Sequence, residues 1–345
     1  MSAALSLRPA SHPRGDVRGE KMLVIDAKTN RFTDSRVGEL ARFVSAGDLV
    51  VMNDAATFPA SLRGRTRSGE PIEARLTEPP FEGAARAILF GAGDWHSKTE
   101  DRKPPPQVKA GDSIAFDGLT ATVVRVDARS PRLVELVFAE QGDDLWKGLF
   151  LAGKPIQYSY LDRELALWDV QTPFASRPFA VEMPSAGRPL AWSVLFDLQK
   201  KGARVARLSH AAGLSSSGDP DLDARLPFAE RYEIPRDTIS AIAETKRNGN
   251  RVVAIGTTVV RALEGCASSH GGALVSGPGE TDLLLSARYA PRIVDAVFSG
   301  THEPGSSHFE LLEAFASRDL LLRAAEHAHE QGYLTHEFGD ACLIQ

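Results

Sequence analysis

The stretch from Arg251 to Glu264 constrains the fold of this chain more than any other. Four apolar residues in a row, Val252 to Ile255, predict a strand buried on both faces. Gly256 permits a sharp turn, and Thr257 or Thr258 is expected to cap the helix that follows. The free N–H groups of such a helix favour an electron-rich ligand group, although an ordinary strand–helix unit with a threonine cap explains the same pattern.

Alternating strand and helix patterns surround this stretch and predict an α/β fold with a mainly parallel sheet. Residues 59–139 differ, because their short strands alternate with period two and are separated by glycine turns. Residues 59–139 are therefore expected to form an inserted all-β, barrel-like domain, with residues 1–58 and 140–345 forming the α/β catalytic domain. A helix over 143–151 is expected to return the chain to the α/β domain.

Composition excludes several classes of protein. The 345 residues carry a net charge of −5, which weakens a case for nucleic-acid binding without excluding a local basic patch. The two cysteines lie far apart, so we expect neither disulfides nor a cysteine metal site and predict a cytoplasmic protein. No apolar run is long enough to span a membrane, and no signal peptide is recognisable.

Polar residues follow several predicted strands, and ligands gather at the carboxyl ends of parallel strands. His210 ends one such strand, and Asn53 and Asp54 end another. His302 follows a third strand after Ser299 and Gly300. A single histidine at a strand end is more often structural, but two on separate strands, each beside glycine and hydroxyl residues, leave a functional site and a structural role equally open. We expect no metal, because His302 and His308 lack a third ligand and His327 and His329 point to different faces of a helix.

The ordered motifs of the chain resemble those of the S-adenosylmethionine:tRNA ribosyltransferase-isomerase family of queuosine biosynthesis. The most specific block is Gly256 to Glu264, and the resemblance continues through 47–54, 281–283, 294–296 and 339–344. The family combines an α/β domain with an inserted β-barrel. The resemblance implies transfer and isomerisation of the ribosyl part of S-adenosylmethionine onto a 7-aminomethyl-7-deazaguanine base in tRNA, giving epoxyqueuosine and releasing adenine and methionine.

The resemblance also implies the partners and the site residues. S-adenosylmethionine is expected as co-substrate, with tRNA as a candidate partner and no prosthetic group. His210 is the predicted base or acid, with Glu230 as its orienting residue, and Asp282, Asp295 and His302 as the wall of the site. The predicted substrate-binding residues are Asn53, Asp54, Gly256, Thr257, Thr258 and Arg261. Arg261 has a second interpretation, an ion pair with Glu264 one helical turn away.

Several positions depart from the family pattern. Two family histidines and several cations are replaced, by Pro189, Phe228, Gly305, Ala56 and Ser61. Arg63, Arg65 and Arg67 remain as a candidate basic patch. The departures keep two alternatives open, namely a paralogue that uses the same donor on a small molecule or another RNA, and a non-catalytic binding protein. We expect weaker tRNA binding than in a typical member.

Overall fold

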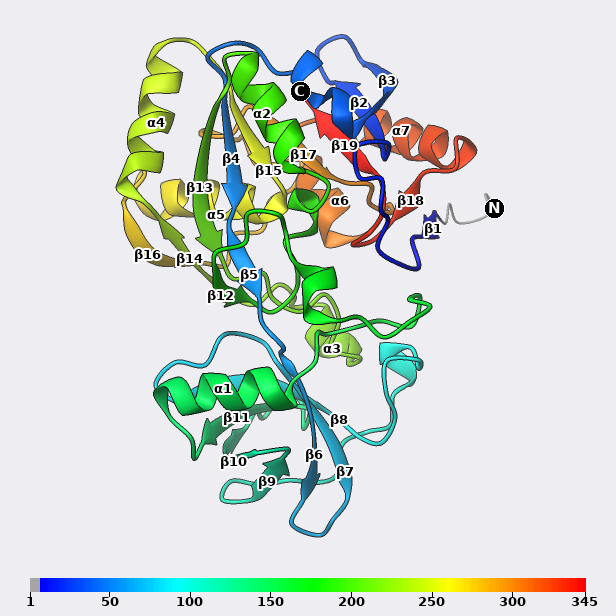
Figure 1. Cartoon of the computed structure of the whole chain (residues 1–345), viewed down its shortest axis with the longest axis vertical. Helices are drawn as coiled ribbons and strands as arrows, with labels where there is room; N and C mark the ends of the chain where they lie inside the picture. Colours follow the sequence, from blue (N-terminus) through cyan, green and yellow to red (C-terminus); the bar gives the residue numbers. More distant parts are fainter. Residues whose placement is uncertain (1–6) are drawn as a thin grey trace.

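The computed structural model describes residues 7–345, which form an upper lobe around a mixed sheet and a lower lobe around a barrel (Figure 1). Within these residues, nine strands form one sheet. In spatial order they are β16 (Gly277–Thr281), β14 (Glu230–Ile234), β13 (Arg204–His210), β4 (Leu49–Asn53), β15 (Val252–Ile255), β17 (Ala296–Gly300), β19 (Ala341–Ile344), β2 (Lys21–Asp26) and β3 (Arg31–Arg36).

The centre of the sheet is parallel. β13, β4, β15 and β17 run in the same direction, as do β19 and β2, and the remaining neighbours are antiparallel. All residues of β4 and β15 are buried, as expected for strands covered on both faces. The predicted α/β fold class is confirmed, and the parallel centre brings the carboxyl ends of four strands to one edge.

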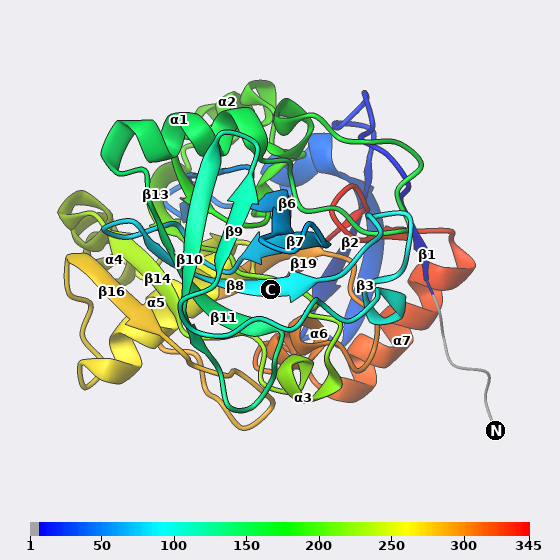
Figure 2. The ribbon, with the colours of Figure 1, turned by 90° about the horizontal axis from the view of Figure 1, so that it is seen from below.

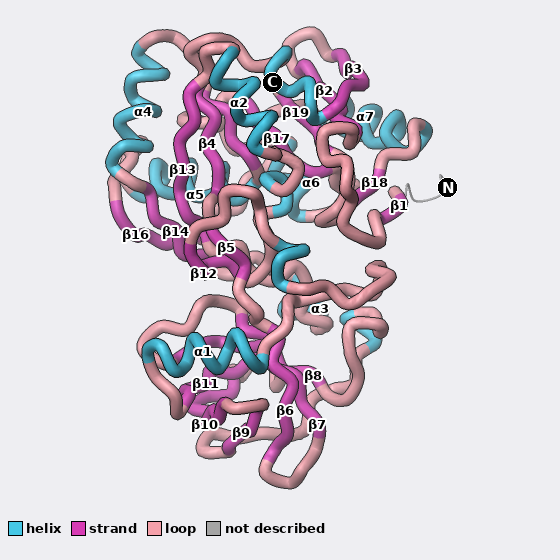
Figure 3. Tube along the Cα trace, in the orientation of Figure 1, coloured by secondary structure: helices cyan, strands magenta, loops and turns pink. Residues whose placement is uncertain are grey.

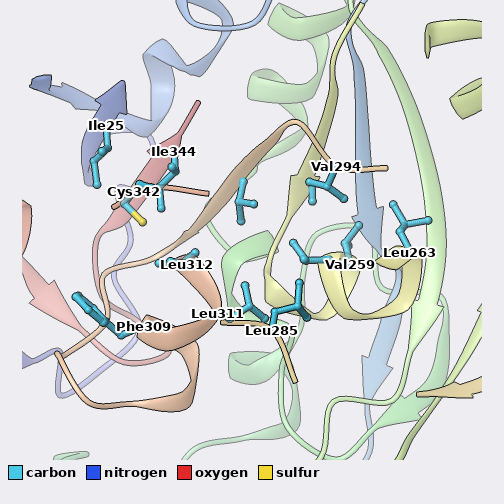
Figure 4. Close-up of a cluster of buried hydrophobic side chains, with 14 of the residues drawn as sticks. Ile25, Val259, Leu263, Leu285, Val294, Phe309, Leu311, Leu312, Cys342 and Ile344 are labelled. Atoms are coloured by element: carbon cyan, nitrogen blue, oxygen red, sulfur yellow. The ribbon is translucent and has the colours of Figure 1, made fainter. Parts of the chain in front are cut away.

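Helices cover both faces of the sheet. The larger core lies between the sheet and α4 (Arg236–Arg247), α5 (Thr257–Ser269), α6 (Ser307–Leu312) and α7 (Arg318–Glu330). Figure 4 shows part of this core, in which Val259 and Leu263 of α5 lie near Leu285 and Val294. The opposite face packs against α2 (Trp192–Lys200) and the 3₁₀-helix η1 (Val37–Arg42). Both cysteines are free and buried.

The lower lobe is a closed barrel of six strands between Ser61 and Phe138, and it is seen from below in Figure 2. Around the barrel the strands are β10 (Leu119–Val126), β11 (Leu133–Phe138), β8 (Ala84–Phe90), β7 (Pro71–Leu76), β6 (Ser61–Thr66) and β9 (Ser113–Phe116). All barrel neighbours are antiparallel, as the period-two alternation predicts. The division into a domain of residues 1–58 and 140–345 and an insertion of residues 59–139 stays a prediction.

The helix after the barrel does not pack where the sequence predicts. α1 (Gly142–Ala152) forms as expected, but its buried residues Leu145 and Leu149 belong to the core of the barrel. Its contacts are with β6 and β10. The correction has a simple physical reason, because an amphipathic helix buries its apolar face against the nearest unfilled core, and sequence periodicity does not specify that core.

An irregular segment joins the two lobes (Figure 3). Between Gly153 and Ala191 it contains only short elements, η3 (Leu167–Val170), β12 (Arg177–Ala180) and η4 (Ser185–Gly187). β12 pairs with β5 (Ala55–Thr57). The other short elements are β1 (Arg8–Pro9), β18 (Leu334–Thr335), η2 (Thr99–Asp101) and α3 (Pro220–Asp223). In residues 7–345, every helix is too short or too polar to span a lipid bilayer.

Candidate functional site

Asn53 connects the strands and helix at the carboxyl edge of the sheet. Its side-chain oxygen accepts hydrogen bonds from the backbone N–H groups of His210 (3.0 Å) and Ala55 (3.1 Å). Its amide donates to the backbone oxygen of His210 (3.0 Å) and to the hydroxyl of Thr258 (3.2 Å). The end of β4 therefore fixes the end of β13 and the start of α5 relative to each other, which positions His210.

Asp54 has a comparable role beside Asn53. Its side chain is buried and accepts a hydrogen bond of 2.6 Å from the Ser209 hydroxyl, while Arg207 lies 3.7 Å away. Asn53 and Asp54, both predicted to bind substrate, thus make hydrogen bonds that position the end of the neighbouring strand β13.

His210 is the central titratable residue of this edge. Its side chain is fully buried, its Nε2 atom lies 3.4 Å from Oε2 of Glu230, and neither ring nitrogen has a hydrogen bond within residues 7–345. Burial lowers the pKa of His210 to about 4, with Glu230 opposing the shift and Arg261 adding to it. The ring is therefore neutral at pH 7 and has a nitrogen available to accept a proton.

Glu230 joins His210 to α5. Its Oε2 atom accepts a hydrogen bond of 2.8 Å from Nε of Arg261, and its Oε1 atom accepts one of 3.0 Å from the backbone of Gly213. Arg261 is buried, and its Nη2 atom has no hydrogen bond among the described residues. These contacts hold Glu230 between His210 and Arg261, and they leave Nη2 of Arg261 without a partner among the described residues and available to a ligand.

The alternative ion pair between Arg261 and Glu264 is wrong. Glu264 is fully buried and accepts hydrogen bonds from the backbone N–H groups of Arg292, Ile293 and Val294. Its carboxylate fixes the loop before β17, and Arg261 turns to Glu230 instead. Helical spacing identifies possible neighbours within α5, but these partners come from other parts of the chain.

The start of α5 differs in one respect from the expectation. Its N-cap is Gly256, with φ 91° and no side-chain cap, so neither Thr257 nor Thr258 caps the helix. A positive φ favours glycine, and a Cβ atom here would lie 3.3 Å from Cβ of Ala186. The N–H groups of the first turn consequently remain available, as an anion-binding helix start requires.

The three remaining predicted site residues, His302, Asp282 and Asp295, lie at different places in the fold. The backbone N–H of Gly256 donates to Phe298 (2.7 Å), which brings the end of β17 next to α5. His302 follows that strand, its Nε2 atom lies 2.8 Å from the Ser299 hydroxyl, and its ring stacks on His308. Desolvation holds the pKa of His302 well below its usual value.

The two aspartates do not join this group. Asp282 is exposed just after Thr281, the β16 residue that pairs with Glu230 in the sheet. Asp295 precedes β17, where it accepts hydrogen bonds from Lys246 (2.7 Å) and from the backbone of Val252 (2.8 Å). Val252 begins β15, so Asp295 lies at the opposite end of the strand from Gly256. The geometry therefore does not support Asp295 as part of the wall of the site.

Sequence analysis did not identify the acidic and aromatic residues of the irregular segment and of the loop before β19. Tyr158 and Glu182 are hydrogen-bonded to each other, as are Tyr160 and Glu337. No periodic pattern marks these residues, because they belong to loops. Among residues 7–345, His, Cys, Asp and Glu side chains do not gather in groups of three or more able to hold a metal ion.

The comparisons with known proteins agree with this architecture. The model of the queuosine biosynthesis protein family matches residues 6–344. The S-adenosylmethionine:tRNA ribosyltransferase-isomerase of Trichlorobacter lovleyi is 30% identical, covering 97% of this chain and 95% of its own. The enzyme of the same name from Thermus thermophilus is 33% identical over 91% of this chain and 89% of its own. The chain belongs to the queuosine biosynthesis protein family.

A solved structure supports the same assignment. The crystal structure of S-adenosylmethionine tRNA ribosyltransferase from Thermotoga maritima has a TM-score of 0.53 and 26% sequence identity. The match covers 98% of this chain and 96% of that one.

Burial of a neutral histidine predicts a pH dependence of stability. The unfolded chain takes up a proton on His210 near pH 6.5, whereas the folded protein does so only near pH 4. This contribution to stability is complete above pH 6.5 and is lost as the pH falls toward 4. At pH 5 it amounts to about 2 kcal/mol.

Urea unfolding of the wild type and of His210→Gln at pH 7.5 and pH 5 measures this contribution. The wild type is expected to lose about 2 kcal/mol more than the variant between the two pH values. Equal losses would mean that the pKa of His210 is close to its usual value in the folded protein.

Proposed function

We propose that this protein is an S-adenosylmethionine-dependent ribosyltransferase-isomerase acting on tRNA. It transfers and isomerises the ribosyl part of S-adenosylmethionine onto a 7-aminomethyl-7-deazaguanine base, giving epoxyqueuosine, adenine and methionine. The observation that carries the proposal is the neutral, buried His210 beside the Glu230–Arg261 pair and the free start of α5. The names of the relatives favour this reaction over a changed acceptor or a non-catalytic binding protein.

The reaction requires a base, because a proton next to the sulfonium must be removed so that its electron pair can expel adenine, after which the amine of the acceptor forms the bond to a ribosyl carbon. His210 is assigned this role, since its ring is neutral at pH 7. Glu230 lies 3.4 Å from the ring and stabilises the imidazolium that forms. His302 is assigned to the departure of adenine, as a group on the neighbouring strand end.

The start of α5 is assigned to the methionine carboxylate of the donor. Thr257 and Thr258 offer backbone N–H groups at the positive end of the helix dipole, and Arg261 offers its Nη2 atom, which has no partner among residues 7–345. Asn53 and Asp54 hold these elements in register. S-adenosylmethionine is thus a co-substrate, and the chemistry assigned to these residues calls for no prosthetic group. A tRNA substrate also favours a cytoplasmic location.

The proposed function is tested by incubating the purified protein with S-adenosylmethionine and tRNA carrying 7-aminomethyl-7-deazaguanine. Nucleoside mass spectrometry should show epoxyqueuosine, and chromatography should show adenine in equal amount. Both products should form in the presence of EDTA. Absence of epoxyqueuosine under these conditions, with the protein folded and the tRNA intact, would refute the proposal.

The basic residues of β6 give a prediction for tRNA binding. Arg63 and Arg65 are both exposed on one face of the strand, as their spacing predicts, and Arg67 follows in the turn. If Arg63 and Arg65 contact phosphates, the double substitution to Gln should weaken tRNA binding uniformly across sequences. The slope of log affinity against log salt should fall by about 1 for each lost contact.

Filter binding between about 50 and 300 mM KCl measures this slope, because counterion release dominates the salt dependence of affinity in roughly this range. Replacing the exposed Arg247 of α4 with Gln is the matched control, because it removes a charge elsewhere on the surface. An unchanged slope for the double variant would place the tRNA on another face.

A further inference from the structure

A small cavity lies between the irregular segment and the loop that precedes β19. Its walls include Thr57, Tyr158, Glu182, Met183 and Glu337. Its volume is about 20 Å³. A water molecule needs roughly 10–15 Å³ by the same measure, so the cavity admits a group of that size rather than a whole nucleobase.

The two carboxyl groups of the cavity are held by neutral donors. Glu182 accepts hydrogen bonds from the Tyr158 hydroxyl and from the backbone (3.0 Å) and hydroxyl (2.5 Å) of Ser215. Glu337 accepts one from the Tyr160 hydroxyl. An ionised carboxylate accepts about four hydrogen bonds, so both groups retain capacity for a further donor.

The charge of these carboxyl groups is not balanced within the cavity. Glu182 and Glu337 are only partly buried, whereas two fully buried carboxylates of the chain have arginine partners, since Glu20 pairs with Arg188 and Glu73 pairs with Arg75. By contrast, the wall of the cavity contains no basic residue among residues 7–345. Desolvation raises the pKa of both Glu182 and Glu337. A bound cation would restore the balance of charge and keep both groups ionised.

The cavity is connected to the candidate site through the backbone. The N–H groups of Val181 and Glu182 both donate to the oxygen of Ala212, at 2.9 and 3.3 Å. Ala212 lies two residues after His210. The cavity therefore borders the loop that leaves the proposed catalytic histidine.

We infer that the cavity bounded by Tyr158, Glu182 and Glu337 binds a primary ammonium group of a substrate. An ammonium group matches the cavity in size, supplies three donors and carries the missing charge. The inference rests on the proposed function, which offers two sources of this group. One is the aminomethyl group of the acceptor base, and the other is the α-ammonium group of S-adenosylmethionine.

The test compares Glu182→Gln and Glu337→Gln with the wild type. Each substitution keeps the shape of the side chain and removes its charge, and Tyr158→Phe is a third variant that removes only a hydroxyl. Glu326→Gln, at an exposed position on α7, is the control for net charge. Circular dichroism establishes that each variant is folded. Dissociation constants are measured for S-adenosylmethionine and for tRNA carrying either guanine or 7-aminomethyl-7-deazaguanine.

The two sources give different results. If the aminomethyl group occupies the cavity, both Gln variants should lose about tenfold or more in affinity for the modified tRNA only, because a charge-assisted hydrogen bond is lost. If the α-ammonium group occupies it, the same loss should appear for S-adenosylmethionine only. Variants that bind both substrates as the wild type does would overturn the inference. Failure of the proposed function is a different result, in which the wild type itself forms no epoxyqueuosine.

Discussion

Replacing His210 with Gln should lower the rate of epoxyqueuosine formation about 100- to 10,000-fold, the usual contribution of a positioned general base. Gln approximates the volume of the ring but cannot accept the proton at neutral pH. Neither ring nitrogen has a hydrogen-bond partner among residues 7–345, so the substitution breaks no internal hydrogen bond of the side chain. The measurement is single-turnover kinetics with both substrates saturating, read by nucleoside mass spectrometry.

Donor affinity separates a loss of chemistry from a loss of structure. The dissociation constant for S-adenosylmethionine should change by less than about threefold in His210→Gln, because the carboxylate-binding start of α5 is intact. His327→Gln is the matched control, since His327 lies on α7 and pairs with Asp34. A variant at position 210 with the wild-type rate would exclude His210 as the base and leave His302 as the alternative.

Replacing Glu230 with Ala should lower the free energy of unfolding by about 3–5 kcal/mol. The substitution removes the partner of Arg261, whose buried guanidinium charge is then uncompensated. It also removes the acceptor of the Gly213 N–H group. Urea unfolding at pH 7.5, followed by circular dichroism, measures the change.

The control for this variant is Glu280→Ala. Glu280 is exposed on β16, next to β14, and should cost less than about 0.5 kcal/mol, as surface substitutions usually do. Equal costs for the two variants would mean that the Glu230–Arg261 pair contributes no more than a surface residue. A double variant, Glu230→Ala with Arg261→Met, should recover part of the loss, because it removes the unpaired charge.

Much of the candidate site was predictable because it depends on local features. A buried apolar run ending in Gly256 predicts a strand, a turn and a helix, and the structure contains all three. His210 was identified from its place at the end of a predicted strand, and the structure places it beside Glu230. These predictions succeed because hydrophobic periodicity and glycine geometry are properties of neighbouring residues.

Contacts between distant segments were not predictable in the same way. A helix over 143–151 was expected, but its packing on the barrel was not. Asp295 belongs to a block that resembles the family pattern. In the structure, however, it lies at the end of β15 away from the turn at Gly256. The partner of Arg261 is a residue of β14 rather than its helical neighbour.

By itself, the sequence determined the class of the fold, the barrel-like insertion, the family resemblance and the strand ends that carry His210 and Thr258. Only the tertiary structure decided which side chains meet there, that His210 is fully buried, and that Glu182 and Glu337 share a cavity whose described wall holds no basic residue. The physical reason is that burial patterns and turn residues act over a few positions of the chain. Desolvation and ion pairing depend instead on every segment that packs around a group, however distant in sequence.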